Sequence, residues 1–479
     1  MLVVLLIIIP LLGGLLTLFA KQKMPFILSL FASLLTVCIS IYSYMQFGLQ
    51  QYESLIYNTS WIAKLGARFH IGIDNGLPML MVLLTAIAFP LIILLTQDKH
   101  TDRPATFYGL LLLAEAGLMG VFLSKDALLF YVFWEIALIP VYFLSALFGG
   151  EHRIKVSFKF FVYTFVGSLL MLVALLYIYN KLPIRSFQWD SLISTSASLS
   201  GTEQNWLFWM MFIAFAIKMP IFPFHTWQPD TYEQSNTPTT MVLSALMVKM
   251  GLFAVIRWLL PLLPDASMYF KHIVMMLSIV GIVYASCLAL IQKDIKRLLA
   301  YSSIAHIGLM CAAIFSHEIL GLQGAVIQMF NHGITILAMW ALVYIIEHRI
   351  GTRNLNDMGG IAQVAPAFTI ALVIISLANI ALPLTNGFVG EFMMFNAIFD
   401  MPTSYHWTFT IVAGLGIILS AVYTLKMVQH IAFGETNALT QTFTDLTITE
   451  KVVLYTLIAM ILVFGFYPNA LLDLVRIGS

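Results

Sequence analysis

Long apolar runs separated by short polar segments fill almost the whole chain. Runs of about 20 residues, the length that crosses the hydrocarbon core of a bilayer, recur from Leu2 to Val475. Only the segments 46–75, 181–204 and 435–449 between them are long. The pattern predicts an all-α polytopic protein with about 14 transmembrane helices, forming a single membrane domain over residues 1–479. The expected spans are 2–20, 26–45, 75–96, 105–123, 126–148, 157–180, 206–228, 237–260, 271–291, 295–316, 319–346, 363–398, 408–433 and 451–473.

Two of these spans carry an interruption. The seventh contains KMPIFP at 218–223 and the twelfth contains PLTNG at 383–387. Proline removes a ladder hydrogen bond, and backbone freed at membrane depth must face protein or water. Paired interruptions are typical of transporters built from inverted repeats, with the ion site at the breaks. We expect two inverted five-helix repeats with discontinuous helices 7 and 12, although two unrelated proline kinks are the alternative. The expected parts are helices 1–3 (1–104), helices 4–8 (105–260), helices 9–13 (271–433) and helix 14 (450–479).

Composition narrows the class of protein. The chain is 60% hydrophobic and 10% charged, which excludes a soluble protein with one core. A formal net charge of +1 gives no reason to expect nucleic acid as a partner. Cys38, Cys287 and Cys311 lie far apart, so no iron–sulfur spacing exists and we expect no redox centre, cofactor or metal in this chain. The first run has no basic residue before it and predicts a retained span rather than a cleaved signal.

The distribution of basic residues predicts the orientation. Lys and Arg are more frequent in loops on one side of the predicted helices, and such loops usually face the cytoplasm. We therefore expect a multi-pass protein of a bacterial inner membrane with both termini on the periplasmic side. The basic residues assigned to the inner side are Lys21, Lys23, Lys99, Arg103, Arg153, Lys155, Lys159, Lys293, Lys296, Arg297, Arg349, Arg353 and Lys451.

Charged residues at membrane depth are costly and are candidates for function. Glu115 and Glu135 flank a predicted turn at 124–126, which places both about 14–15 Å deep. Lys218 and Lys249 flank the polar segment 231–236 and lie about 18 Å deep. A lysine whose glutamate partner approaches and withdraws can release and recover a proton. We prefer Glu135 with Lys218 as such a pair; bracing between helices is the alternative for the acids, and snorkelling for the lysines.

Histidines supply a second set of candidates. His306 and His332 flank a turn at 317–318 and should face one another near mid-membrane, while His225 follows the first interruption. A neutral imidazole can take a proton at one ring nitrogen and release one at the other. A buried histidine that only donates a hydrogen bond is the alternative.

Two further charges lie near the second interruption. Glu391 follows it in GFVGE (387–391), where glycines admit backbone and water and the surroundings are apolar. Lys426 lies about 12 Å from the expected inner edge and is either a relay or a snorkelling anchor.

Four stretches carry a family resemblance. They are DALLFYVFWE (126–135), KMPIFPFHTWQPD (218–230), LLAYSSIAHIG (298–308) and GFVGE (387–391). They resemble the antiporter-like proton-pumping subunits of respiratory NADH:quinone oxidoreductase, complex I. The resemblance covers spans 4–13 and implies the fold expected above. It implies Glu135 and Lys218 as a coupled pair, Lys249 as central relay, and His306 and His332 as water-linked connectors; His225 belongs to helix 7.

Within this family the chain is most similar to the M-type members. It has Glu391 where L- and N-type subunits and sodium/proton antiporter homologues usually carry lysine, and it ends after span 14 without the lateral helix of L-type subunits. The resemblance implies L-, N- and K-like membrane neighbours and a peripheral arm, with NADH, FMN, iron–sulfur clusters and quinone in partner subunits. The rival functions are a subunit of a multisubunit Na⁺/H⁺ antiporter and a quinone-reducing or scaffolding membrane subunit.

Overall fold

The computed structural model describes residues 1–97 and 102–476, and most of them are helical. Within this described part, eleven helices are long and apolar enough to cross a membrane, and two shorter apolar helices accompany them. The predicted all-α polytopic architecture is therefore confirmed, while the count of about 14 spans stays a prediction. Lys99, assigned to the inner side above, lies outside the described residues.

The chain forms two compact units. Unit 1 contains residues 1–219, 246–270 and 474–479, and unit 2 contains 220–245 and 271–473. The elements of unit 1 are α1 (Leu2–Leu18), α2 (Met24–Gly48), β1 (Ile56–Ile62), β2 (Ala67–Gly72), α3 (Gly76–Leu95), α4 (Pro104–Leu123), α5 (Ala127–Phe148), α6 (Arg153–Lys181), α7 (Trp189–Thr195), α8 (Gly201–Lys218), α11 (Val248–Ala254) and α12 (Leu260–Leu262).

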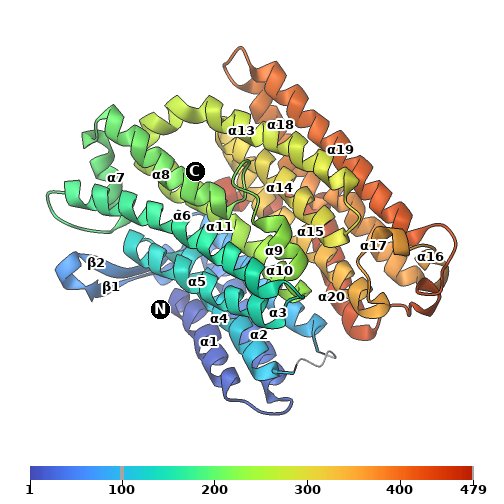
Figure 1. Ribbon diagram of the computed structural model, residues 1–479. Coiled ribbons are helices and arrows are strands. Elements are labelled where there is room, and N and C mark those ends of the chain that lie inside the picture. The colour runs from blue at the N-terminus through green and yellow to red at the C-terminus, as the bar shows by residue number, and fades with distance from the viewer. Residues whose placement is uncertain (98–101, 477–479) are drawn as a thin grey trace. The chain divides into compact units, whose positions relative to one another are not determined.

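The interior of unit 1 is built on α3 and α4, which are mostly buried, whereas α2 and α6 expose most of their surface. α1 packs against α2 and α4, and α4 also packs against α5 (Figure 1). Exposed Leu, Ile and Phe side chains cover the outer faces of α2 and α6, as expected where lipid or another subunit is the solvent.

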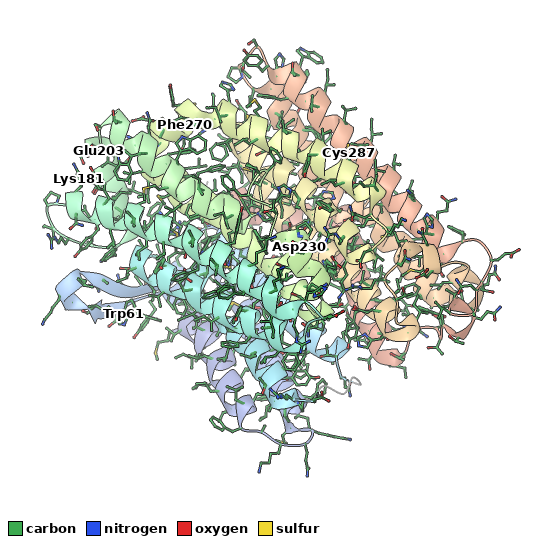
Figure 2. All side chains as sticks on the ribbon, in the orientation of Figure 1. Trp61, Lys181, Glu203, Asp230, Phe270 and Cys287 are labelled. Atoms are coloured by element: carbon green, nitrogen blue, oxygen red, sulfur yellow. The ribbon has the colours of Figure 1, made fainter. Side chains whose placement is uncertain are left out.

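A β-hairpin occupies the long segment between α2 and α3, where the sequence pattern predicted only a loop. β1 pairs antiparallel with β2, from Ile56 opposite Gly72 to Ile62 opposite Ala67, with an irregularity after Ser60. At the other long connection, Lys181 lies beside Glu203 near the ends of α6 and α8 (Figure 2). The Lys181 Nζ to carboxylate distance is 2.6 Å. The ion pair and several hydrogen bonds hold the pKa of Glu203, which lies outside the spans, below its ordinary value.

Unit 2 is arranged around α15, which is buried from Gly324 to Ile346 and contacts α14, α17, α18 and α20. The more exposed α19 and α20 lie at its periphery. The elements are α9 (Gln228–Gln234), α10 (Thr237–Val242), α13 (Pro264–Ile291, whose first residues belong to unit 1), α14 (Ile295–Ile314), α15 (Ile319–Ile350), α16 (Ile361–Val364), α17 (Pro366–Asn379), α18 (Asn386–Asp400), α19 (His406–Ala432), α20 (Ile448–Phe466) and α21 (Asn469–Arg476, whose end belongs to unit 1).

Both predicted interruptions are present. α8 ends at Lys218 and helix resumes at Gln228, and α17 ends at Asn379 and helix resumes at Asn386. One boundary was wrong: the seventh span was expected to end at residue 228, but helix continues as α9 to Gln234, so only Ser235 and Asn236 form the turn before α10. Pro229 lies in the first turn of α9, where proline is tolerated.

The two units share a turn of the same construction. Asp126 caps α5 by accepting from the N–H groups of Leu128 and Leu129, and Asp294 caps α14 in the same way. In each unit a later segment closes on the turn as an isolated antiparallel bridge, Asp126 with Gln188 and Asp294 with Asn354. The flanking backbone hydrogen bonds also correspond: Ala127 N–H to Phe187 and Ile295 N–H to Arg353.

Candidate functional site

Unit 1 buries Glu115 completely. Its carboxylate lies in the middle of α4 with no exposed surface, and within the described residues neither oxygen has a hydrogen-bond partner. A buried polar atom without a partner is costly. The structure therefore gives Glu115 no bracing hydrogen bond or ion pair within the described part of this chain, which weighs against the purely structural alternative.

Glu135 and Lys218 lie in the same unit without forming an ion pair. Lys218 is 2% exposed, and no hydrogen-bond partner of its Nζ occurs in the described part of the chain. The ammonium instead lies 5.5 Å from the centre of the Trp134 ring, a cation–π distance. Glu135 follows Trp134 on α5, interacts with Ser168 of α6 and is within electrostatic reach of Lys218. The two charges are thus close enough to interact electrostatically, but they do not form an ion pair.

Glu135 is also less buried than expected. The depth arithmetic placed it near mid-membrane, and the structure leaves its side chain half-buried beside exposed Ile136. Depth along a helix does not determine which face a residue occupies, and Glu135 lies at the border between the packed and the exposed face of α5. The unit therefore presents one side of this carboxylate to whatever covers α5.

Lys249 is fully buried on α11. The helix that carries it changes to π geometry at Leu243–Met247, immediately before α11, and again at Val255–Leu259 after it. Such π segments are rare and often accompany functional positions. No sequence signal marks them, because apolar residues such as Leu243 and Met247 fit either helix type.

In unit 2 the candidate side chains contact one another directly. His306 Nδ1 lies 3.1 Å from Glu391 Oε1, and the rings of His306 and His332 are 5.3 Å apart between their centres. All three side chains are buried. The spacing around the His317 turn predicted the approach of the two histidines. The expectation of purely apolar surroundings for Glu391 was wrong, because α14 and α18 pack together and bring His306 against it.

Polar residues hold the second interruption beside this centre. Asn331 Nδ2 donates to the carbonyl of Asn386 at 2.7 Å, and Asn386 Nδ2 donates back to the carbonyl of Asn331 at 3.2 Å. Thr335 also donates to Asn386 at 3.2 Å. These bonds tie α15 to the start of α18 beside the break, and the sequence could suggest them only through polar residues inside apolar helices.

The two remaining candidates are more isolated. His225 lies in the first interruption with its ring 5.3 Å from that of Tyr284 and 5.8 Å from that of Phe222, and its Nδ1 has no hydrogen-bond partner among the described residues. Lys426 is exposed on α19 and donates to the carbonyl of Leu290 at 3.2 Å. Within residues 1–97 and 102–476, no three His, Cys, Asp or Glu side chains gather in a group that could hold a metal ion.

Comparison with known proteins identifies the family. The model of the NADH:quinone oxidoreductase/Mrp antiporter membrane family matches residues 124–420. NADH-quinone oxidoreductase subunit M of Rickettsia prowazekii is 37% identical over 95% of this chain and 92% of its own length. F(420)H(2) dehydrogenase subunit M of Methanosarcina mazei is 34% identical over 98% and 95%. A chain of respiratory complex I from Thermus thermophilus superposes with a TM-score of 0.90 at 27% identity, covering all of both chains.

The chain belongs to the subunit M family of NADH-quinone oxidoreductases.

The M-type chain also has charged clusters that sequence reasoning did not single out. In unit 1, Asp74 accepts from Lys125 at 3.1 Å and from Arg257 at 2.6 Å. In unit 2, Lys296 lies 3.0 Å from Glu347 and donates to the Ser235 carbonyl at 3.2 Å. These groups lie at helix ends, where single charges resemble ordinary loop residues, so only the folded chain shows which of them meet.

Proposed function

We propose that this chain translocates protons as the M-type membrane subunit of an NADH:quinone oxidoreductase, and that its buried acids, lysines and histidines carry them. One observation supports this assignment most: Glu115, Glu135 and Lys218 are ionisable groups inside unit 1 with carboxylate or ammonium atoms that lack a hydrogen-bond partner in the described residues. Such groups are costly for folding and are retained where their charge must change.

In unit 1, Glu135 and Lys218 form the coupled pair, and Lys249 receives the proton that the pair releases. Moving one charge against 100 mV requires about 2.3 kcal/mol, roughly a fifty-fold change in a proton equilibrium. Making or breaking one buried ion pair supplies a change of that size. The open geometry over Trp134 supports a lysine that can gain or lose its carboxylate partner. Glu115 supplies a second buried carboxylate beside this relay.

In unit 2, the proton passes between Glu391 and His332 through His306. The direct contact of His306 with Glu391 supports this order, because it places His306 between His332 and the carboxylate. His225, at the first interruption, is buried and acts as a connector there.

The complex and its setting follow from this assignment. L-, N- and K-like membrane subunits flank the chain, and NADH, FMN, iron–sulfur clusters and quinone reside in partner subunits. Both termini face the periplasm of a bacterial inner membrane. Helices 4–8 and 9–13 form inverted repeats, an arrangement supported by the matching Asp126 and Asp294 turns with their bridges to Gln188 and Asn354.

Replacing Lys218 by alanine tests the function in the whole complex. In inside-out membrane vesicles, we expect Lys218→Ala to reduce NADH-driven proton uptake by about tenfold or more, since the relay loses its ammonium group. Lys64→Ala, which changes an exposed lysine outside the spans, serves as the matched control. Normal proton uptake per NADH in Lys218→Ala would show a scaffolding subunit. Sodium exchange by a complex without flavin or iron–sulfur subunits would show the antiporter function instead.

A further inference from the structure

A cavity of about 130 Å³ lies in unit 2 at the end of α13 and α19. Its rim includes exposed Ile291 and Lys293, and its wall carries Lys426 and His430 of α19. Because a single water needs roughly 10–15 Å³, the cavity is large enough for several. The basic side chains make it a polar recess in an otherwise lipid-facing helix.

Tyr423 forms the inner wall of this cavity. The side chain is 1% exposed, and it also lines a second, smaller cavity of about 20 Å³. That second cavity is lined by His306 and Glu391 and has room for about one water. Tyr423 is therefore shared by the basic recess and the centre that joins His306 to Glu391.

The Tyr423 hydroxyl is placed to connect the two cavities. It donates to Ser302 Oγ at 2.9 Å. Ser302 lies one helical turn before His306 on α14, so both side chains point to the same face. Asn379 Nδ2 lies 3.5 Å from Ser302 Oγ and 3.4 Å from Thr424 Oγ1. Asn379 also lines a third cavity, of about 10 Å³, together with His306, His332 and Glu391.

We infer that Tyr423 and Ser302 form the proton passage between the His306–Glu391 centre and the recess walled by Lys426 and His430. In one transfer, the Tyr423 oxygen takes a proton from a hydronium in the recess and passes its own hydroxyl proton to Ser302 Oγ. Ser302 then releases its proton to a water beside Glu391. One proton enters, one leaves, and both hydroxyls are neutral afterwards. The basic side chains of Lys426 and His430 set the electrostatic potential where the passage meets the recess.

The recess opens on one particular side. The segments around Lys293 and Asn356 form its rim, and two basic residues are near them in the sequence: Arg297 in the first turn of α14 and Arg353 in the loop after α15. Basic loops usually face the cytoplasm. The passage therefore connects unit 2 with the inner face of the membrane. This inference rests on the proposed function, because it requires Glu391 to carry a proton.

Tyr423→Phe in the whole complex is the first test. It removes the hydroxyl and keeps the ring, and we expect NADH-driven proton uptake in inside-out vesicles to fall on the order of tenfold. Ser302→Ala should act alike, since it removes the partner of the same hydrogen bond. Tyr455→Phe, on an exposed face of α20, should pump normally. Pumping by Tyr423→Phe at the wild-type rate would overturn the inference.

Thiol accessibility provides a measurement that a merely structural Tyr423 would not change. Met427 is buried and lines the recess, whereas Ile418 is 61% exposed on the outer face of α19. In a Cys287→Ser background, a charged, impermeant methanethiosulfonate should modify Met427→Cys from the inner face and inhibit pumping, and leave Ile418→Cys unaffected. Reaction only from the outer face, or no reaction in assembled complex, would contradict an inner-face recess.

The two proposals can fail separately. If Glu391→Gln and Lys218→Ala both pump normally, the proposed function fails and the passage fails with it. If those two variants lose pumping while Tyr423→Phe and Ser302→Ala retain it, the function stands and only the passage is wrong.

Discussion

The middle of unit 1 and the middle of unit 2 hold their buried ionisable groups in different ways. Unit 1 keeps Lys218 out of ion-pair contact with Glu135 and places its ammonium over Trp134. Unit 2 closes a direct contact between His306 and Glu391. An ammonium that is held apart from a carboxylate responds to any change in the local field, whereas an imidazole in contact with a carboxylate can exchange a proton without moving. Under the proposed function, this difference predicts a field-sensitive first centre and a contact-transfer second centre.

The end regions of the units differ from both centres. There the charges are paired closely, as in Asp74 with Lys125 and Arg257, and in Lys296 with Glu347. Closed pairs stabilise helix ends, and their charges change little at neutral pH. Among the described residues, the middle of unit 1 thus keeps a carboxylate and an ammonium group without a hydrogen-bond partner, those of Glu115 and Lys218. The following experiments test this difference from the closed pairs at the helix ends.

The largest effect is expected at the closed contact of unit 2. His306→Gln keeps an amide donor for Glu391 but cannot take up and release a proton, so proton pumping should fall about a hundredfold. Pumping and NADH oxidation are measured together in inside-out vesicles. His348→Gln, the same exchange at an exposed position of α15, is the control. If His306→Gln pumps like wild type, hydrogen bonding alone suffices and the contact-transfer description is incorrect.

The next effect concerns a closed pair of unit 1. Asp74→Ala leaves buried Arg257 and Lys125 without their shared carboxylate, which should lower the free energy of unfolding by about 2 kcal/mol. Burial raises the pKa of Asp74, but Arg257 and Lys125 outweigh it and hold that pKa below its ordinary value. The stability is therefore present at neutral pH and lost as the pH falls through the lowered pKa. Thermal inactivation of the purified complex measures the change.

Asp74→Ala also tests whether the paired charges at the helix ends take part in pumping as the central charges are proposed to do. Asp74→Ala should leave the ratio of protons pumped to NADH oxidised unchanged at temperatures where the complex is intact. A changed ratio would place Asp74 in the proton path and would break the division between closed end pairs and open central charges.

A smaller effect is expected at the ring beneath Lys218. Trp134→Leu removes a desolvated cation–π contact worth about 1–2 kcal/mol, so pumping should fall by up to about tenfold. Trp134→Phe retains an aromatic face, so its pumping rate should lie between those of Trp134→Leu and wild type. Equal pumping rates for Trp134→Leu and wild type would show that the ring only fills space and that Lys218 is stabilised in another way.

How far the sequence could predict these centres depends on the interaction concerned. Periodicity and turn positions sufficed for the approach of His306 and His332, because both flank one short turn on adjacent helices. The contact of His306 with Glu391 could not be predicted, since it joins residues 85 positions apart through the packing of α14 and α18.

The sequence also could not predict which face of a helix a residue occupies or where a helix takes π geometry. The helix rise predicted a depth for Glu135 from its position in the chain, but it could not predict that Glu135 lies on a half-buried face of α5. The β-hairpin and the π segments around Lys249 carry no distinct residue signal. Tyr423 was missed for a related reason, because a tyrosine in an apolar helix is ordinary until its hydroxyl partner is known.

The smallest effect is expected at Asp445, which caps the start of α17 although it lies far from that helix in the sequence. Asp445, in the loop after α19, accepts the N–H groups of Ala367 and Phe368 at the start of α17, at 3.0 and 2.9 Å. Burial raises its pKa, but these bonds and that from Leu446 outweigh it, so the pKa lies below its ordinary value. Asp445→Asn keeps one acceptor oxygen and should cost about 0.5–1 kcal/mol, less than Asp445→Ala.

The pH dependence of that cost identifies its cause. A lowered folded pKa means that the charge stabilises α17 above the ordinary pKa of an aspartate, about 3.9, and that this stability is lost as the pH falls through the folded value. The stability difference between wild type and Asp445→Asn, from thermal inactivation of the complex, should be constant between pH 6 and 8, roughly two units or more above that pKa, and shrink on further acidification. A difference that stays constant on further acidification would mean that the charge of Asp445 does not stabilise α17, and the closed-end description would then apply to unit 1 alone.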